Sequence, residues 1–207
     1  MINFNLSLHK KGIIQKWITN KDKFLLIEGI EGVGKSTLGK SILSDYYVIH
    51  INYDYHKDKN LLQYIEESLN TKNIWMMINN KNSNKAIIID DIFYFIKYDK
   101  LLLLKILDIL KKYLGNIPII LILSINNNYN IKHKIIDRIY SSSYKIKLKY
   151  DYNRYIDILK LHISNNDSII KLHEFIKIYN FNLNSIISNI DNIYGKNTYI
   201  IDKEYDI

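Results

Sequence analysis

Residues 29 to 37 are Gly29-Ile30-Glu31-Gly32-Val33-Gly34-Lys35-Ser36-Thr37, and they follow directly on the apolar run Phe24-Leu25-Leu26-Ile27. The run has the composition of a buried strand, and the glycines after it let the backbone curl so that successive N–H groups point inward. A helix that begins near Lys35 would add its positive N-terminal dipole. Strand, loop and helix come in the order that a phosphate-binding loop requires. The stretch therefore predicts a site for a nucleoside triphosphate, against the simpler alternative of a chance glycine-rich turn.

Each residue of this loop is a candidate for binding the nucleotide. Lys35 is expected to reach the β and γ phosphates, and the Ser36 hydroxyl is expected to coordinate Mg²⁺. The candidate nucleotide-binding residues are Gly29, Ile30, Glu31, Gly32, Val33, Gly34, Lys35, Ser36 and Thr37.

The composition indicates a compact intracellular protein. The chain has 207 residues, of which 47% are hydrophobic, and this suits one α/β domain with a small appendage. Cysteine is absent, so the sequence offers no disulfide and no thiolate metal ligand. We expect no signal peptide and no membrane partner, and hence a soluble protein of the cytoplasm or nucleus. The net charge of +8 comes almost wholly from lysine and permits contact with nucleic acid.

Short β-branched runs alternate with longer helical patterns, which is typical of a parallel sheet covered by helices. We therefore predict an α/β fold with a five-stranded parallel sheet. The expected strands cover residues 24–28, 47–52, 85–90, 119–124 and 144–148, and the expected helices between them cover 35–44, 60–69 and 100–113.

The pattern becomes purely helical after Lys149. Three further helices are expected there, over residues 155–163, 168–179 and 184–194. We therefore predict a nucleotide-binding α/β domain over 1–149, a small all-helical lid over 150–195 and an unassigned C-terminal tail over 196–207.

Two carboxylates end the third predicted strand. Ligands of open parallel sheets bind beyond the carboxyl ends of the strands, so Asp90 and Asp91 should face the same region as the phosphate-binding loop. Asp90 is placed to hold Mg²⁺ together with Ser36, and Asp91 to orient or deprotonate an attacking water. The alternative is that one of them caps the following helix or pairs with a lysine.

The fourth predicted strand also ends in polar residues. Asn126 follows Leu123-Ser124-Ile125 and is placed to contact the γ phosphate or the attacking water. Asparagine after a strand is equally compatible with ordinary turn chemistry.

With these motifs the chain resembles the AAA+ ATPases, and among them the clamp-loader subunits of the replication factor C type. Residues 29–37 match the Walker A loop of the family, and Asp90-Asp91 occupy the place of its Walker B acidic pair. Residues 48–52, followed by Asp54, look like its second strand. Leu123 to Asn126 look like its sensor 1 strand, which makes Asn126 the sensing residue.

The resemblance continues into the predicted lid. Residues 151–162 are similar to the start of the AAA+ lid, and residues 182–190 resemble a lid segment that reads Asp-Leu-Arg in relatives. In all, the resemblance covers about residues 20 to 195. It implies ATP and Mg²⁺ as ligands, and other AAA+ subunits, DNA and a sliding clamp as partners.

Several residues depart from the family pattern. Asp91 stands where members usually have Glu, and Asn184 stands where the lid carries the sensor 2 arginine. Ser141-Ser142-Ser143 replaces Ser-Arg-Cys, so the clamp-loader arginine finger is absent. Arg138 lies near the place of a finger in other members and is a candidate catalytic residue; the alternative is a surface arginine at a helix end.

These features favour an ATP-binding and ATP-hydrolysing module that acts in DNA replication and is clamp-loader-like. Its candidate catalytic residues are Lys35, Asp91, Asn126 and Arg138. Two alternatives stay open. Residues 26–37 also resemble the start of thymidylate-like kinases, although those enzymes need arginines and this chain has only Arg138 and Arg154. The other alternative is a nucleotide-binding scaffold subunit with little hydrolysis, because an arginine finger can contribute ~10³ to 10⁵ in rate.

Overall fold

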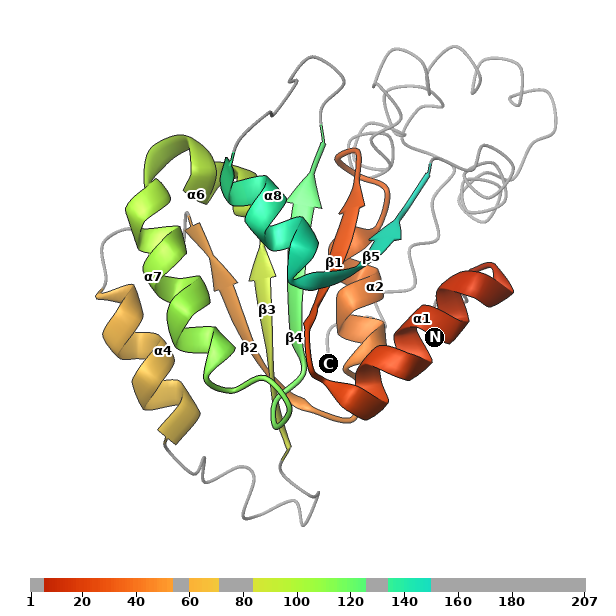
Figure 1. Cartoon of the computed structure of the whole chain (residues 1–207), viewed down its shortest axis with the longest axis horizontal. Helices are drawn as coiled ribbons and strands as arrows, with labels where there is room; N and C mark the ends of the chain where they lie inside the picture. The colour runs from red at the N-terminus through yellow and green to blue at the C-terminus, as the bar shows by residue number, and fades with distance from the viewer. Residues whose placement is uncertain (1–5, 54–59, 71–83, 126–133, 150–207) are drawn as a thin grey trace, which may run out of the picture. The chain divides into compact units, whose positions relative to one another are not determined.

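A sheet of five parallel strands forms the centre of the molecule. The computed structural model describes residues 6–53, 60–70, 84–125 and 134–149. The strands lie in the spatial order β2-β3-β4-β1-β5, and each neighbouring pair is parallel (Figure 1). The predicted five-stranded parallel sheet is thereby confirmed. The strands are β1 (Phe24–Gly29), β2 (Tyr47–Asn52), β3 (Lys85–Asp90), β4 (Ile119–Ser124) and β5 (Ser143–Lys147).

Some sequence predictions fall outside the described residues. They concern Asn126, the helices expected over 155–163, 168–179 and 184–194, the lid at 150–195 and the tail at 196–207. These stay predictions. The helices and strands that the structure describes all belong to one compact unit, which they form within the bounds 1–29 and 34–148.

Helices cover both faces of the sheet. On one face, α4 (Leu61–Asn70), α6 (Ile92–Tyr98), α7 (Lys100–Lys111) and α8 (Lys134–Ser141) share a hydrophobic core with the strands (Figure 1). On the other face lies α2 (Lys35–Ile42), while α1 (Leu8–Asn20) packs against β1 and β5. Because both faces are covered, the strands are apolar along most of their length, and residues 119–123 of β4 are all buried.

The order of the strands fixes where a ligand can bind. Strand β1 lies between β4 and β5. After β1 the chain crosses to β2 at one edge of the sheet, comes back through β3 and β4, and then forms β5 on the other side of β1. Helix α2 follows β1 on one face, and α8 lies between β4 and β5 in sequence on the other face. In open parallel sheets, ligands bind at such a switch point, beyond the carboxyl ends of the strands. Gly29 lies there beside Ser124, and its carbonyl accepts a hydrogen bond from the Ile125 N–H at 3.0 Å.

A glycine brings α2 close to the sheet. A Cβ atom placed on Gly39 would lie 3.6 Å from Cδ1 of both Ile88 and Ile122, and 3.8 Å from Cγ2 of Ile120. Helix positions i and i+3 share a face, so the side of α2 that carries Gly39 also carries Ser36. The close approach at Gly39 therefore brings Ser36 toward the carboxyl end of β3.

Gly39→Ala is expected to raise the free energy of unfolding by about 0.5 to 1 kcal/mol. A methyl group fits at ordinary van der Waals distances, and alanine lowers the entropy of the unfolded chain and favours the helix. Gly39→Leu should instead destabilise the fold by about 1 to 3 kcal/mol, because its extra carbons would have to displace the three isoleucines. Urea unfolding of both variants measures the difference, and a destabilising alanine would contradict the packing described.

Candidate nucleotide-binding site

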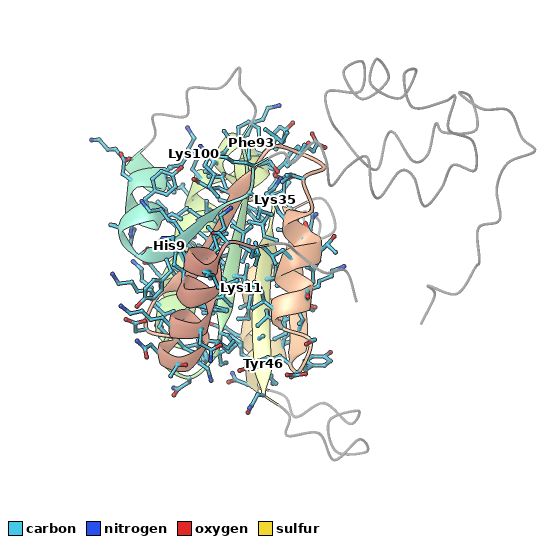
Figure 2. The ribbon with its side chains drawn as sticks, turned by 90° about the vertical axis from the view of Figure 1, so that its right-hand side faces the viewer. His9, Lys11, Lys35, Tyr46, Phe93 and Lys100 are labelled. Atoms are coloured by element: carbon cyan, nitrogen blue, oxygen red, sulfur yellow. The ribbon has the colours of Figure 1, made fainter. Side chains whose placement is uncertain are left out.

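The phosphate-binding loop joins β1 to α2, as the sequence predicts. Gly32 and Gly34 have φ values of 77° and 87°, in the left-handed region that residues with a Cβ avoid. This backbone curl places Lys35 at the first position of α2, where the residue is only 6% exposed. Lysine is rarely so buried in a folded protein. Lys35 lies toward the same end of the sheet as Phe93 and away from Tyr46 (Figure 2).

Asp90 and Ser36 are brought together across the sheet and α2. Asp90 is the last residue of β3 and lies on the same face of the strand as Ile88, because side chains alternate along a strand. Ile88 faces Gly39 of α2, so Asp90 faces the first turn of that helix. Its carboxylate is hydrogen-bonded to the Ser36 side chain. The two residues predicted to hold a metal are thus neighbours.

Three groups around Asp90 favour its ionised form. Burial alone would raise the pKa of this carboxyl group, but hydrogen bonds from the side chains of His50 and Ser36 lower it. The positive field of His50 and the backbone N–H of Asp91 lower it further. The net result is a pKa below the ordinary value for aspartate. Asp90 is therefore an acceptor-only carboxylate at neutral pH.

The oxygen atoms of this pair fit Mg²⁺. A hydroxyl and an ionised carboxylate are hard oxygen ligands, and proteins commonly bind Mg²⁺ through one or two such groups together with substrate phosphates. Ser36 and Asp90 would hold the ion beside the phosphate-binding loop. When bound, Mg²⁺ would neutralise charge on the phosphate oxygens.

Asp91 has an unusual backbone. Its φ and ψ angles are 57° and 54°, a left-handed conformation that costs a residue with a Cβ about 1 to 3 kcal/mol. It occupies the N-cap position of α6, but its side chain makes no capping hydrogen bond. The interpretation of Asp91 as a helix cap is therefore not supported. Its backbone N–H contacts the Asp90 carboxylate, so the turn at Asp91 also shapes the metal site.

A second carboxylate lies at the end of the central strand. Glu28 precedes Gly29 directly, and its Oε2 accepts a hydrogen bond from the Tyr140 hydroxyl of α8 at 2.9 Å. Burial and the neighbouring Glu28 carboxylate raise the pKa of Tyr140 to about 12, so the hydroxyl stays a hydrogen-bond donor further into the alkaline range than an ordinary tyrosine does. The contact ties α8 to β1 one residue before the phosphate-binding loop.

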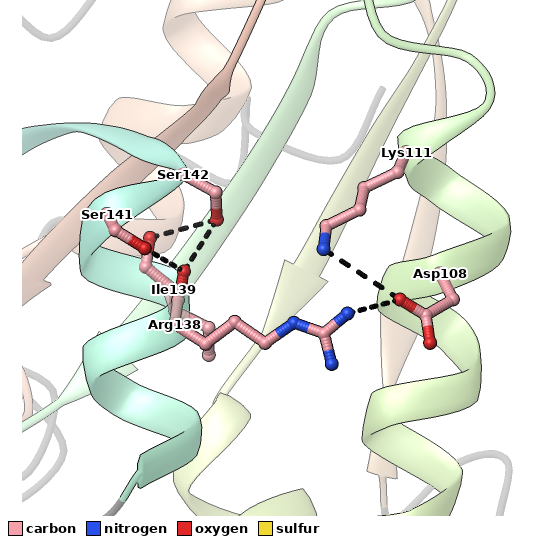
Figure 3. Close-up of polar contacts among 6 residues, drawn as sticks. All are labelled: Asp108, Lys111, Arg138, Ile139, Ser141 and Ser142. Carbon is pink, nitrogen blue, oxygen red and sulfur yellow. Dashed lines mark hydrogen bonds and ion pairs between the residues drawn. The ribbon is translucent and has the colours of Figure 1, made fainter.

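Arg138 forms an ion pair with Asp108 on the surface of the described fold. Its Nη2 atom lies 2.6 Å from Oδ1 of Asp108 on α7, and Nζ of Lys111 lies 3.8 Å from the same oxygen (Figure 3). Both partners of the closer pair are about half exposed, and such surface pairs are weak. An arginine finger would have to leave Asp108 before it could reach a phosphate.

The serines after Arg138 end α8. The hydroxyls of Ser141 and Ser142 donate to the Arg138 carbonyl at 2.9 and 2.8 Å (Figure 3). The Ser143 hydroxyl donates to the Ile139 carbonyl at 2.6 Å. These carbonyls lie in the last turn of the helix, and the Ser142 N–H reaches them only at 3.3 and 3.2 Å, so the shorter hydroxyl bonds add to a weak helix end. The three serines therefore have a structural role here.

Solved structures of other proteins share this fold. No family model matches the sequence, and no curated protein does. Among solved structures, the Aeropyrum pernix ORC1 protein in complex with DNA matches with a TM-score of 0.59 at 12% identity, over 92% of this chain and 61% of that one. Aquifex aeolicus DnaA bound to AMPPCP matches with a TM-score of 0.55 at 17% identity, over 94% of this chain and 64% of that one. This chain has an AAA+ P-loop NTPase fold.

A third structure with this AAA+ fold, the Aeropyrum pernix ORC2 protein in its ADPNP-ADP complexes, has a TM-score of 0.54 at 12% identity and covers 77% of this chain. Only 52% of that protein is covered, so this chain spans less than two thirds of each of the three structures. Within the described residues, no helix combines the length and the hydropathy needed to cross a membrane.

Sequence reasoning missed two contacts at the site, the Glu28–Tyr140 hydrogen bond and the contact between His50 and Asp90. The Oδ2 atom of Asp90 lies 3.3 Å from Nε2 of His50. The sequence contains one signal for the contact between His50 and Asp90. His50 lies two residues before the end of a predicted strand, and therefore near the carboxyl edge of the sheet. Without the strand order, nothing placed that strand beside Asp90.

Proposed function

We propose that the chain is an AAA+-type module that binds and hydrolyses ATP and acts in DNA replication. The observation that carries the proposal is the contact between Ser36 of the phosphate-binding loop and Asp90 at the end of β3. It joins the two motifs that a P-loop NTPase needs for Mg²⁺ and phosphate, at the switch point of the sheet. The buried position of Lys35 at the start of α2 supports the same function.

The residues of the site take distinct roles in this proposal. Lys35 and the loop N–H groups contact the phosphates, and Ser36 with Asp90 holds Mg²⁺. Asp91 orients the attacking water, and Asn126 contacts the γ phosphate. Arg138 acts only after release from Asp108, in the site of a neighbouring subunit.

The proposed partners are DNA and further AAA+ subunits. Support comes from the solved structures with this fold, which are of ORC proteins and DnaA and, in one case, of a complex with DNA. These names favour an initiator-like role over the clamp-loader-like role that the sequence motifs suggest. A sliding clamp would be a partner only in the clamp-loader-like role.

One set of assays tests the proposal. ATP hydrolysis is measured alone, with duplex DNA and with primed DNA, and phosphate transfer from ATP to thymidine monophosphate is measured in parallel. Hydrolysis stimulated by DNA is the expected result, and stimulation by primed DNA in particular would favour a clamp-loader-like role. Transfer to the nucleotide would replace the proposal by the kinase, and tight ATP binding without turnover would replace it by the scaffold.

A further inference from the structure

We infer that His50 is a positioning residue for the magnesium site, because its imidazole holds the Asp90 carboxylate in the orientation that faces Ser36. The inference rests on the proposed function and adds to it a residue outside both nucleotide-binding motifs. It predicts that substitution of His50 lowers the affinity for Mg²⁺ but does not change the affinity for nucleotide in the absence of Mg²⁺.

The sheet places His50 beside Asp90. Strands β2 and β3 are parallel neighbours, with His50 opposite Ile88 and Asn52 opposite Asp90. His50 and Asp90 therefore project from the same face of the sheet, the face that α2 covers. The imidazole reaches diagonally across one residue pair, and its Nε2 atom lies 3.3 Å from Oδ2 of Asp90.

The direction of this hydrogen bond follows from the carboxylate. An ionised carboxylate only accepts hydrogen bonds, so Nε2 of His50 must carry the proton that it shares with Oδ2. The Nε2–H tautomer of the neutral ring and the imidazolium both provide this donor, and the inference does not depend on the charge of His50. The Ser36 hydroxyl is a second partner of the same carboxylate. Two donors from different elements thus restrict the side-chain rotation of Asp90.

A ligand that is held in this way binds a metal better. Hydrogen bonds from outer groups orient the residues that contact a metal, and their removal typically lowers metal affinity or activity by about 10- to 100-fold. Asp90 is the more buried partner, with its side chain 15% exposed against 36% for His50. Removal of the imidazole would free the carboxylate to turn and admit water beside it.

The test measures Mg²⁺ and nucleotide binding separately in the full chain. A fluorescent ATP analogue is titrated in EDTA, and Mg²⁺ is then titrated at a fixed concentration of the analogue. His50→Phe keeps a planar ring without the donor, and His50→Gln places an amide N–H near the position of Nε2. His9→Gln, at an exposed position on α1, is the matched control. His50→Ala replaces His50→Phe if the larger ring impairs folding.

The expected result is a 10- to 100-fold rise in the Mg²⁺ concentration for half-saturation in His50→Phe, with affinity in EDTA unchanged within twofold. His50→Gln should recover most of the loss, and His9→Gln should behave as the wild type. A Mg²⁺ dependence that stays within twofold of the wild type in His50→Phe and His50→Ala would overturn the inference. So would an equal loss of nucleotide affinity in EDTA, since that result indicates a structural role. A wild-type chain that binds no nucleotide under either condition would overturn the proposed function as well.

Discussion

Lys35→Ala is expected to lower the affinity for ATP by about 100-fold or more. Lys35 lies at the first turn of α2 and is 6% exposed, so its ammonium group would meet the β and γ phosphates in a region with little water. Loss of one partner from a buried, hydrogen-bonded charge pair costs about 2 to 5 kcal/mol, and a hundredfold change in affinity corresponds to roughly 2.8 kcal/mol. Isothermal titration with ATP and Mg²⁺ measures the change.

The matched control for this prediction is Lys40→Ala. Lys40 belongs to the same helix and is exposed, so its removal changes the net charge equally without touching the loop. Its ATP affinity should stay within threefold of the wild type. Circular dichroism of both variants checks that α2 and the sheet persist. Retention of ATP binding by a folded Lys35→Ala chain would refute the assignment of the loop.

The strands of this fold could be predicted from the sequence because their signals are local. Both faces of the sheet are covered, so the runs over 85–90 and 119–124 are apolar throughout and end abruptly. The observed bounds of β2, β3 and β4 agree with the predicted ones, and those of β1 and β5 differ by one residue. Helices α2, α4 and α7 were also expected close to their observed bounds.

No bounds were predicted for helices α1, α6 and α8. Helix α6 has only two turns, and it begins at a left-handed residue, Asp91, which does not bear the usual capping hydrogen bond. Ile92, Phe95 and Ile96 do have helical spacing, but so short a segment gives a weak periodic signal. Helix α1 buries mainly one residue, Trp17, so its sequence shows no continuous apolar stripe. The indole N–H of Trp17 donates to the Lys23 carbonyl.

The candidate site could be predicted only as separate motifs. The loop at 29–37 and the acidic pair at 90–91 are local patterns with known chemistry. Their contact depends on the order β2-β3-β4-β1-β5 and on the approach of α2 at Gly39, and both are properties of the whole fold. The same dependence explains why His50 was not recognised as a neighbour of Asp90.

Asp91→Asn is expected to slow ATP hydrolysis by about 10²- to 10⁴-fold and to leave ATP affinity within threefold of the wild type. General-base catalysis contributes a factor of this size, and asparagine has the shape of aspartate without its basic carboxylate. Asparagine also tolerates the left-handed backbone of this position, whose φ is 57°. Single-turnover hydrolysis with DNA present measures the rate.

One further variant separates the effect of the Asp91 carboxylate from the effect of its backbone conformation. Asp91→Gly removes the side chain from a conformation that glycine adopts freely, so the free energy of unfolding should change by no more than about 1 kcal/mol while hydrolysis falls as in Asp91→Asn. Asp99→Asn is the control, because Asp99 caps α7 through the Leu102 N–H at 2.9 Å and asparagine caps equally well. If Asp91→Asn and Asp91→Gly keep more than a third of the wild-type rate, the carboxylate has no part in hydrolysis. The strained turn at Asp91 would then serve only to bring its N–H to Asp90.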